Sequence, residues 1–331
     1  MNTEYMKRRK IAIVCGGDSS EMKVSLKSAE GLFSFIDKVR YQVWIVFLNK
    51  KDWYVKFDNN EKAVIDKNDF SFMHDGKKIS FDFAWITIHG TPGEDGRLQG
   101  YFDLIGLPYS CCGVLAAALT FNKFACNQYL KGFGVKVAES IMLRQGQRIS
   151  SEDLVEKLGL PCFIKSNVGG SSFGTSKVKS LEEVQQAIKN AFNEGNEIIA
   201  ESFLSGTEVT CGCYKTSSET RLLPVTEVVS KNEFFDYEAK YKGKVQEITP
   251  ARISDDLRDR IQQISSMIYD IIGCKGIIRV DYIITEKGIS LLEVNTTPGM
   301  TTTSFIPQQV SAAGMTMANV MQEIIEDSFL Y

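Results

Sequence analysis

Four polar residues in the last sixth of the chain could bind a divalent metal ion. Arg279 and Asp281 lie in one apolar run, and Glu293 and Asn295 lie in the next. Glu293 and Asn295 are two residues apart, so on a strand they face the same side, and a hairpin partner would bring Asp281 beside them. Such oxygen ligands suit Mg²⁺, which leaves coordination positions for substrate phosphates. A structural salt-bridge network is the alternative, and Arg279 could also stabilise negative charge in a transition state.

A glycine- and serine-rich segment follows Lys165 and could bind phosphate. Residues 165–174 read KSNVGGSSFG. Glycine tolerates positive φ and lets backbone amides approach phosphate oxygens closely. The lysine precedes the glycines, so the segment does not match the P-loop pattern GxxxxGKS or GxxxxGKT. The tip of a flexible hairpin is the alternative interpretation of this segment taken alone.

Two further segments combine hydroxyl, imidazole and carboxylate groups. Residues 296–304 follow the candidate metal strand, and their hydroxyls and amides could receive a carboxylate. Residues 89–96, HGTPGEDG, follow an apolar strand at the sheet edge where α/β folds bind ligands. His89 alone could equally be a histidine satisfied at a strand end.

The elements that must position these groups begin with a parallel α/β unit. Residues 11–14, 43–48 and 83–88 are strand-like, and the apolar spacing between 29 and 36 predicts a helix packed on the sheet. Gly16 and Gly17 place backbone amides before this helix, where an anion can bind. The segment lacks both GxGxxG and an acidic ribose-binding residue after the second strand, so a Rossmann dehydrogenase is not supported.

The rest of the chain predicts a long helix, a small α/β segment and a strand-rich region. The long helix covers 114–129 and ends near Gly132 and Gly134. Predicted strands cover 162–165, 198–203, 209–214, 222–229, 276–284 and 290–294, and predicted helices cover 181–192 and 257–272. Two more helices are expected after Pro307. The longest irregular stretch, 231–249, is typical of an active-site lid.

Composition excludes several classes of protein. The 331 residues are 44% hydrophobic and 24% charged, which is typical of globular proteins and excludes disordered, collagen-like and coiled-coil chains. The formal net charge of −3 provides no basic field for nucleic acid or anionic lipid. The basic run 7–10 precedes an apolar segment too short for a signal peptide or membrane span, so a cytoplasmic location is expected. The eight cysteines predict reduced packing thiols, because none has the CxxC spacing of a zinc site.

Taken together, these segments resemble the D-alanine–D-alanine ligases of the ATP-grasp superfamily. The matching motifs follow the family's order along nearly the whole chain: HGTPGEDG, LGLPCFIKS with GGSSFGTSKV, AESFLSGTEVT, FFDYEAKY, GCKGIIRVDY and LLEVNTTPGMTTTSFIP. The resemblance implies an α/β ATP-grasp fold and a homodimer. It also implies three domains: a substrate-binding domain with a parallel sheet at 1–120, a central domain at 121–208, and a C-terminal domain at 209–331 with the metal site and lid.

The activity implied by the resemblance is the joining of two D-alanine molecules for peptidoglycan synthesis. In this family ATP phosphorylates the carboxylate of the first D-alanine. The amine of the second D-alanine then attacks the acyl phosphate through a tetrahedral intermediate. An acyl phosphate exposed to water would hydrolyse, so a lid that excludes water is expected over the phosphates.

The resemblance also implies where the two D-alanine molecules bind. Glu21 matches the anchor of the first ammonium, and His89 lies near the first carboxylate in such enzymes. Ser171 matches the loop serine that links Glu21 with Tyr241. Arg279 and the backbone of Gly299 match the groups that stabilise the tetrahedral intermediate. Ser304 and Phe305 match the site that receives the second carboxylate.

The nucleotide and metal residues are carried over from the family in the same way. Phosphates are expected at Lys123 and Lys165, and Lys240 belongs to the lid. Adenine and ribose are expected at Glu201, Phe203, Leu204 and Glu208. The expected ligands of two Mg²⁺ ions, for which Mn²⁺ could substitute, are Asp281, Glu293 and Asn295.

Three departures from the family pattern and two alternative functions remain. The N-terminal tail through Arg9 matches no part of the family pattern. Ser166 stands where many relatives have proline, and Phe305 where leucine is common, which leaves details of the second subsite open. A D-alanine–D-lactate ligase is one alternative. Tyr241 argues against it, because lactate-forming relatives have a different loop or phenylalanine there. A catalytically inactive ATP-grasp protein is the other, but the expected metal and phosphate residues are all present.

Overall fold

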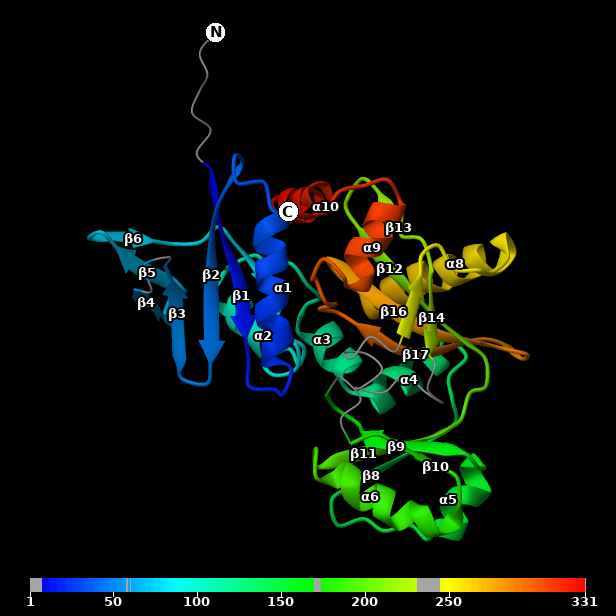
Figure 1. Cartoon of the computed structure of the whole chain (residues 1–331). Helices are drawn as coiled ribbons and strands as arrows, with labels where there is room; N and C mark the ends of the chain where they lie inside the picture. Colours follow the sequence, from blue (N-terminus) through cyan, green and yellow to red (C-terminus); the bar gives the residue numbers. More distant parts are fainter. Residues whose placement is uncertain (1–7, 58, 60, 170–173, 231–244, 331) are drawn as a thin grey trace.

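The computed structural model describes residues 8–57, 59, 61–169, 174–230 and 245–330. It arranges them in three sheets, each accompanied by helices (Figure 1).

A seven-stranded sheet in the order β6-β5-β4-β3-β2-β1-β7 forms the N-terminal part. Its strands are β1 (Arg9–Gly16), β2 (Tyr41–Asn49), β3 (Asp52–Lys56), β4 (Lys62–Asp66), β5 (Ser71–His74), β6 (Lys77–Ile79) and β7 (Phe83–Ile86). β1 pairs in parallel with β2 and β7, and α1 (Met22–Phe35) packs on β1, which confirms the predicted parallel α/β unit. The antiparallel extension from β3 to β6 was not predicted, because its strands are only three to five residues long and give little room for an alternating pattern. Helix α2 (Arg97–Ile105) follows β7.

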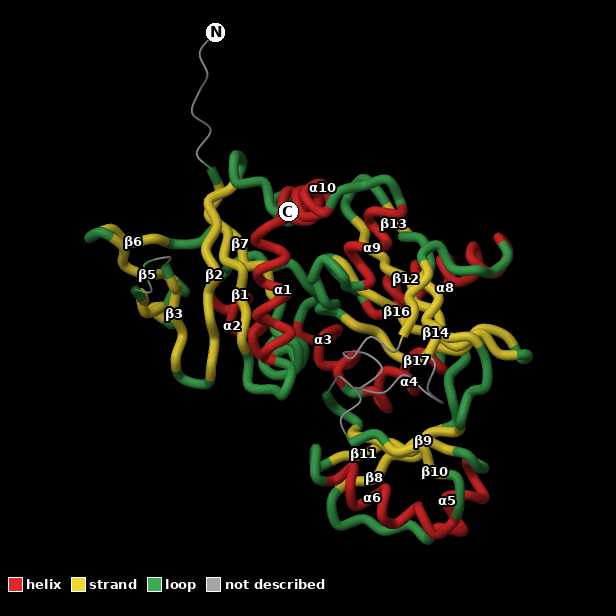
Figure 2. The backbone as a smooth tube through the Cα atoms, viewed as in Figure 1, coloured by secondary structure: helices red, strands yellow, loops and turns green. Residues whose placement is uncertain are grey.

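The central part is a small antiparallel sheet in the order β10-β9-β11-β8. Its strands are β8 (Ser140–Arg144), β9 (Cys162–Ser166), β10 (Ser176–Val178) and β11 (Glu197–Ser202). Helices α5 (Ser151–Leu158) and α6 (Val184–Phe192), the latter preceded by the 3-10 turn Leu181–Glu183, cover one face of this sheet (Figure 2). Leu154, Ile164 and Ala187 are buried in the core between sheet and helices.

The C-terminal part contains a six-stranded sheet in the order β15-β14-β12-β16-β17, with β13 paired to β12. Its strands are β12 (Thr207–Lys215), β13 (Thr220–Leu222), β14 (Thr226–Ser230), β15 (Val245–Ile248), β16 (Ile277–Thr285) and β17 (Gly288–Asn295). Helix α8 (Asp255–Ile272) packs on β12 through Ile261, Ile268 and their neighbours. The side chain of Ser254 accepts a hydrogen bond from Leu257 N at the start of α8.

The predicted long helix at 114–129 is wrong, because the chain forms two helices there. These are α3 (Val114–Phe121) and α4 (Lys123–Lys131), and Asn122 between them is extended, with φ −92° and ψ 99°. The side chain of Asn122 accepts a hydrogen bond from Ala125 N and so caps α4. Continuous apolar periodicity hid the break, since Asn122 fits the helical spacing but its side chain favours a cap.

The predicted strand at 222–229 is also interrupted. It divides into β13 and β14, and Pro224 lies in the gap. Proline has no N–H to donate to a sheet, so the ladder cannot continue through it. The first of the two C-terminal helices, α9 (Phe305–Ala312), begins two residues before Pro307 rather than after it. Pro307 lies in the first turn, where a helix tolerates the missing N–H.

The last two helices join the C-terminal part to the N-terminal sheet. Residues of α9 and α10 (Met317–Asp327) share one buried core with β1 and α1, including Ile11, Leu32 and Ile325. At the edge of this core the Tyr41 hydroxyl donates a hydrogen bond to Glu326 Oε1 at 2.8 Å. The chain therefore closes on itself through apolar packing between its two ends.

Two sequence-based expectations concern cysteines and membranes. All eight cysteines are buried free thiols, as predicted for packing residues. Among the described residues, no helix has both the length and the hydropathy needed to cross a membrane.

Candidate active site

A cavity of about 830 Å³ lies where the three parts meet. It is bounded by the turn before α1, the start of α4, strands β9, β12, β16 and β17, the segment after β11, and the start of α9. Its lining includes these predicted site residues: Glu21, Lys123, Lys165, Glu201, Phe203, Leu204, Glu208, Arg279, Asp281, Glu293 and Phe305. The fold thus gathers, around one space, groups that span most of the chain.

The other predicted site residues have different positions. His89, Asn295, Gly299 and Ser304 are not part of the described lining. His89 and Ser304 precede the lining residues Gly90 and Phe305, Asn295 contacts Glu293, and Gly299 lies beside Ser304. Ser171, Lys240 and Tyr241 lie outside the described residues, as does most of the predicted lid.

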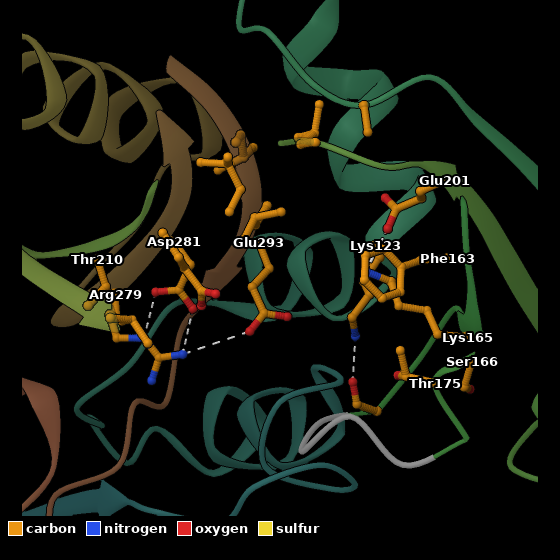
Figure 3. A pocket seen from close by; sticks show the side chains of 18 of the residues that line it. Lys123, Phe163, Lys165, Ser166, Thr175, Glu201, Thr210, Arg279, Asp281 and Glu293 are labelled. Carbon is orange, nitrogen blue, oxygen red and sulfur yellow. Dashed lines mark hydrogen bonds and ion pairs between the residues drawn. The ribbon is translucent and has the colours of Figure 1, made fainter. Parts of the chain in front are cut away.

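One wall carries an arginine and two carboxylates on the β16–β17 hairpin (Figure 3). Asp281 pairs with Glu293 and Arg279 with Asn295, so the predicted hairpin is confirmed. Arg279 Nε and Nη2 donate hydrogen bonds to both Asp281 oxygens at 2.8 and 2.7 Å, and Nη2 lies 3.8 Å from Glu293 Oε1. Burial alone would lower the pKa of Arg279, but its attraction to Asp281 and these hydrogen bonds hold that pKa above the usual range.

The oxygen donors of this wall suit a hard cation. Asn295 Nδ2 lies 3.2 Å from both Asp281 Oδ2 and Glu293 Oε1, so the amide and the two carboxylates converge. No group of three or more His, Cys, Asp or Glu that could hold a metal occurs in the described chain, and the predicted set has two carboxylates with one amide. The salt-bridge network left open by the sequence is present too. The two interpretations are compatible, since a carboxylate has about four lone-pair directions.

The opposite wall carries two lysines from different elements (Figure 3). Lys165 Nζ on β9 lies 2.6 Å from Glu201 Oε2, and Lys123 Nζ on α4 donates to the carbonyl of Gly169 at 2.5 Å. Burial lowers the pKa of Lys123, and the positive charge of Lys165 adds to this. Burial would also lower the pKa of Lys165, but attraction to Glu201 raises it above its usual value. Two partly buried cations facing two carboxylates across a cavity can bind a polyanion that carries divalent cations.

The N-terminal loops form a third side of the site. The Ser19 hydroxyl donates a hydrogen bond to the carbonyl of His89 at 2.7 Å, and Asp18 N donates to Thr91 O at 3.0 Å. Gly90 has φ +74°, and a Cβ there would lie 2.8 Å from Ser19 Cβ, so glycine permits this close approach. These contacts hold Glu21, which is 8% exposed, beside the loop that carries His89.

Phe305 connects the arginine to the hydroxyl-rich turn. The Arg279 guanidinium carbon lies 5.3 Å from the centre of the Phe305 ring, within the range of a cation–π contact. Ser304 precedes α9, and its hydroxyl accepts a hydrogen bond from Thr301 N at 3.1 Å. The predicted subsite for the second D-alanine therefore borders the wall that carries Arg279.

Glu94 has a place in the site that the sequence did not indicate, although the residue lies in the HGTPGEDG motif. Gly90 N donates to Glu94 Oε2 and the Thr297 hydroxyl donates to Oε1, both at 2.7 Å. Removal from water raises the pKa of Glu94 to about 7, and the negative charges of Glu21 and Glu293 contribute, although both hydrogen bonds lower it. Glu94 joins the N-terminal loop to the turn after β17, and its place beside the matched His89 was the only sequence signal.

The fold and the cavity define the class of protein. The fold is similar to the VanG D-Ala:D-Ser ligase from Enterococcus faecalis, with a TM-score of 0.86, 30% identity, and coverage of 97% of this chain and 100% of that chain. It is equally similar to D-alanyl-alanine synthetase A from Vibrio cholerae, with a TM-score of 0.86, 26% identity, and coverage of 98% and 99%. The chain thus has the mixed α/β ATP-grasp fold of these ligases.

Sequence comparisons give the family. The family models for the D-ala D-ala ligase N-terminus and C-terminus match residues 10–112 and 129–326. A D-alanine–D-alanine ligase from Bacteroides fragilis is 64% identical over 323 residues, which cover 97% of this chain and 100% of that protein. One from Porphyromonas gingivalis is 51% identical over 324 residues, covering 97% and 98%. The chain belongs to the D-alanine–D-alanine ligase family.

Proposed function

We propose that this chain joins two D-alanine molecules to D-alanyl-D-alanine, with conversion of ATP to ADP and phosphate, for peptidoglycan precursor synthesis. The observation that carries the proposal is the cavity in which Lys123 and Lys165 face Asp281 and Glu293. Family membership supplies the reaction, and the cavity supplies groups suited to both the nucleotide and the substrates.

The nucleotide would occupy the side of the cavity formed by the central and C-terminal sheets. Lys123 and Lys165 would bind its phosphates, and Lys240 would close over them. Adenine and ribose would contact Glu201, Phe203, Leu204 and Glu208. In support, the four adenine and ribose residues and the two described lysines all line the cavity.

Two Mg²⁺ ions would be held by Asp281, Glu293 and Asn295, whose side chains lie in contact and whose carboxylate and amide oxygens have the hard donor chemistry that fits this ion. When bound, Mg²⁺ would neutralise charge on the phosphate oxygens. Both Asp281 oxygens accept hydrogen bonds from Arg279, so Asp281 would share its remaining lone pairs with the metal.

The first D-alanine would be anchored by its ammonium at Glu21, with its carboxylate near His89. Ser171 would link Glu21 to Tyr241. Transfer of the γ-phosphoryl group to the carboxylate forms the acyl phosphate, and the amine of the second D-alanine then attacks its carbonyl carbon. Phosphate leaves as the tetrahedral intermediate collapses, and the attacking amine loses a proton.

Arg279 would stabilise the oxyanion of this intermediate together with the backbone N–H of Gly299. Donors fixed before reaction stabilise developing charge without reorganisation. Asp281 fixes the Arg279 guanidinium through two hydrogen bonds. Ser304 and Phe305 would receive the second D-alanine, and the Phe305 ring beside Arg279 supports a subsite next to the oxyanion position.

The domain organisation, the oligomeric state and the location of the protein belong to the same proposal. The three sheets support three domains at 1–120, 121–208 and 209–331. The protein would act as a homodimer in the cytoplasm, where its nucleotide substrate is available. Light scattering on the purified full chain tests the dimer.

The test of function is phosphate release from ATP and Mg²⁺ with D-alanine, L-alanine, or D-alanine plus D-lactate, and identification of products by mass. We expect release that requires D-alanine and yields the dipeptide. A depsipeptide would indicate a D-alanine–D-lactate ligase instead. ATP binding without D-alanine-dependent turnover would indicate a catalytically inactive protein of this fold.

A further inference from the structure

We propose that Asn167 is a positioning residue for ATP, because it fixes Lys123 and Lys165 relative to each other. The inference rests on the proposed function, which assigns both lysines to the phosphates. Asn167 has none of the roles described above. It directly follows β9, two residues after Lys165, and it is 0% exposed.

One side of Asn167 holds the first turn of α4. Its backbone carbonyl accepts a hydrogen bond from Lys123 N at 3.1 Å, and its side-chain Oδ1 accepts one from Phe124 N at 2.9 Å. Helix N-termini have free N–H groups that need acceptors. Here two consecutive N–H groups, one of them on Lys123 itself, are bound to the residue that ends the Lys165 strand.

The other side of Asn167 is held by a buttress of polar side chains. Its Nδ2 donates to Asn122 Oδ1 at 2.9 Å and to Glu197 Oε2 at 3.1 Å. Glu197 Oε1 in turn accepts from Arg144 Nε at 2.9 Å. The Arg144 hydrogen bond is the main cause that keeps the pKa of Glu197 below its usual value. An ionised Glu197 needs hydrogen-bond donors, and Phe124 N needs an acceptor. The side chain at position 167 must therefore donate to Glu197 and accept from Phe124 N, as an asparagine amide does.

The two lysines repel each other, so the hydrogen bonds of Asn167 are needed to hold them at a fixed separation. The positive charge of Lys165 contributes to lowering the pKa of Lys123, so the two cations interact through the protein. They come from a helix and a strand, and among the described residues the β-bridge that lies between these two elements pairs Asn122 with Val168. A phosphate group bound by both lysines needs them at a fixed separation, and small displacements of binding groups reduce rates strongly.

The decisive variant is Asn167→Asp, which keeps the shape and the acceptor for Phe124 N but replaces the donor with an oxygen facing Glu197. We expect KM for ATP to rise about tenfold to 10²-fold, while KM for D-alanine stays within about twofold. In the double variant Asn167→Asp with Glu197→Gln, the glutamine amide can donate to the new carboxylate. We expect this reversal of donor and acceptor to recover most of the ATP affinity.

Ser265→Ala is the matched control. Ser265 is also 0% exposed, and its hydroxyl bonds to Ile261 O and Tyr282 Oη in the C-terminal core, away from the lysines. We expect it to lower thermal stability without changing KM for ATP.

ATP affinity measured by calorimetry on the full chain tests Asn167 even if ligation itself fails, so the two failures are distinguishable. An unchanged ATP affinity in Asn167→Asp would overturn the inference. The inference would also be overturned if Asn167→Asp lost thermal stability as Ser265→Ala does and the double variant did not recover ATP affinity. That result would show that Asn167 has only a structural role.

Discussion

Arg279 binds both carboxylate oxygens of Asp281, two residues further along the same strand, at 2.8 and 2.7 Å. Residues i and i+2 of a strand face the same side, so the pair is built into β16 without help from another element. Arginine is the side chain whose planar donors match a carboxylate in this way. The candidate oxyanion group and a candidate metal ligand are therefore positioned by one local contact.

The first prediction follows from this pair. Arg279→Lys removes the planar donors, so we expect kcat to fall by about 10²-fold, as when an oxyanion donor is lost. Steady-state kinetics with D-alanine and ATP measure this. Arg258→Lys on α8 is the control, because Arg258 makes only exposed ion pairs with Asp255 and Asp259. Equal turnover in Arg279→Lys and wild type would contradict the oxyanion role.

Glu293→Gln tests the metal site. The variant keeps the side-chain shape but removes the charge of a proposed Mg²⁺ ligand, so we expect turnover to fall by about 10²-fold or more and the Mg²⁺ requirement to rise. Activity is titrated with Mg²⁺, and circular dichroism shows whether the variant is folded. Glu286→Gln, on the exposed turn of the same hairpin, should behave as wild type. Near-wild-type activity of Glu293→Gln at low Mg²⁺ would refute the assignment.

Tyr241→Phe tests the choice of the second substrate. Tyr241 lies outside the described residues, so this prediction rests on the family resemblance alone. We expect the variant to incorporate more D-lactate relative to D-alanine at neutral pH. Mass spectrometry of products from mixed substrates gives the ratio. Tyr54→Phe on β3 serves as a control. The role would be excluded by a product ratio identical to that of wild type.

The raised pKa of Glu94 predicts how the free energy of unfolding depends on pH. Its pKa is raised from 4.5 to about 7, chiefly by removal from water, so folding favours the protonated carboxyl. The contribution of Glu94 to stability is therefore fully present below the unfolded pKa and is lost as pH rises through the folded pKa. Glu94→Gln stays neutral at all pH values and should lack this loss.

The measurement is the free energy of unfolding in urea from about pH 4 to about pH 8, compared between wild type and Glu94→Gln. We expect wild type to lose stability relative to the variant as pH rises through this window. Parallel pH profiles would contradict the raised pKa of Glu94.

Much of the fold could be predicted from local patterns. The alternation in 276–284 and 290–294 predicted the hairpin that β16 and β17 form, and the i, i+2 spacing of Glu293 and Asn295 predicted their shared face. The same kind of pattern failed at Asn122 and Pro224. In both places apolar periodicity continued while the chemistry of a single residue ended the element.

The sequence by itself determined the residue types, the strands and helices that carry them, and the order of motifs that indicates the family. Each of these depends on neighbours within a few residues, where backbone geometry sets the spacing. The tertiary structure alone decided that Lys123 and Lys165 line one cavity, that Glu94 meets Thr297, and that Asn167 connects α4 to β9. These contacts join segments far apart along the chain. They form only when burial of apolar surface packs the sheets together, and no periodic pattern in the sequence encodes them.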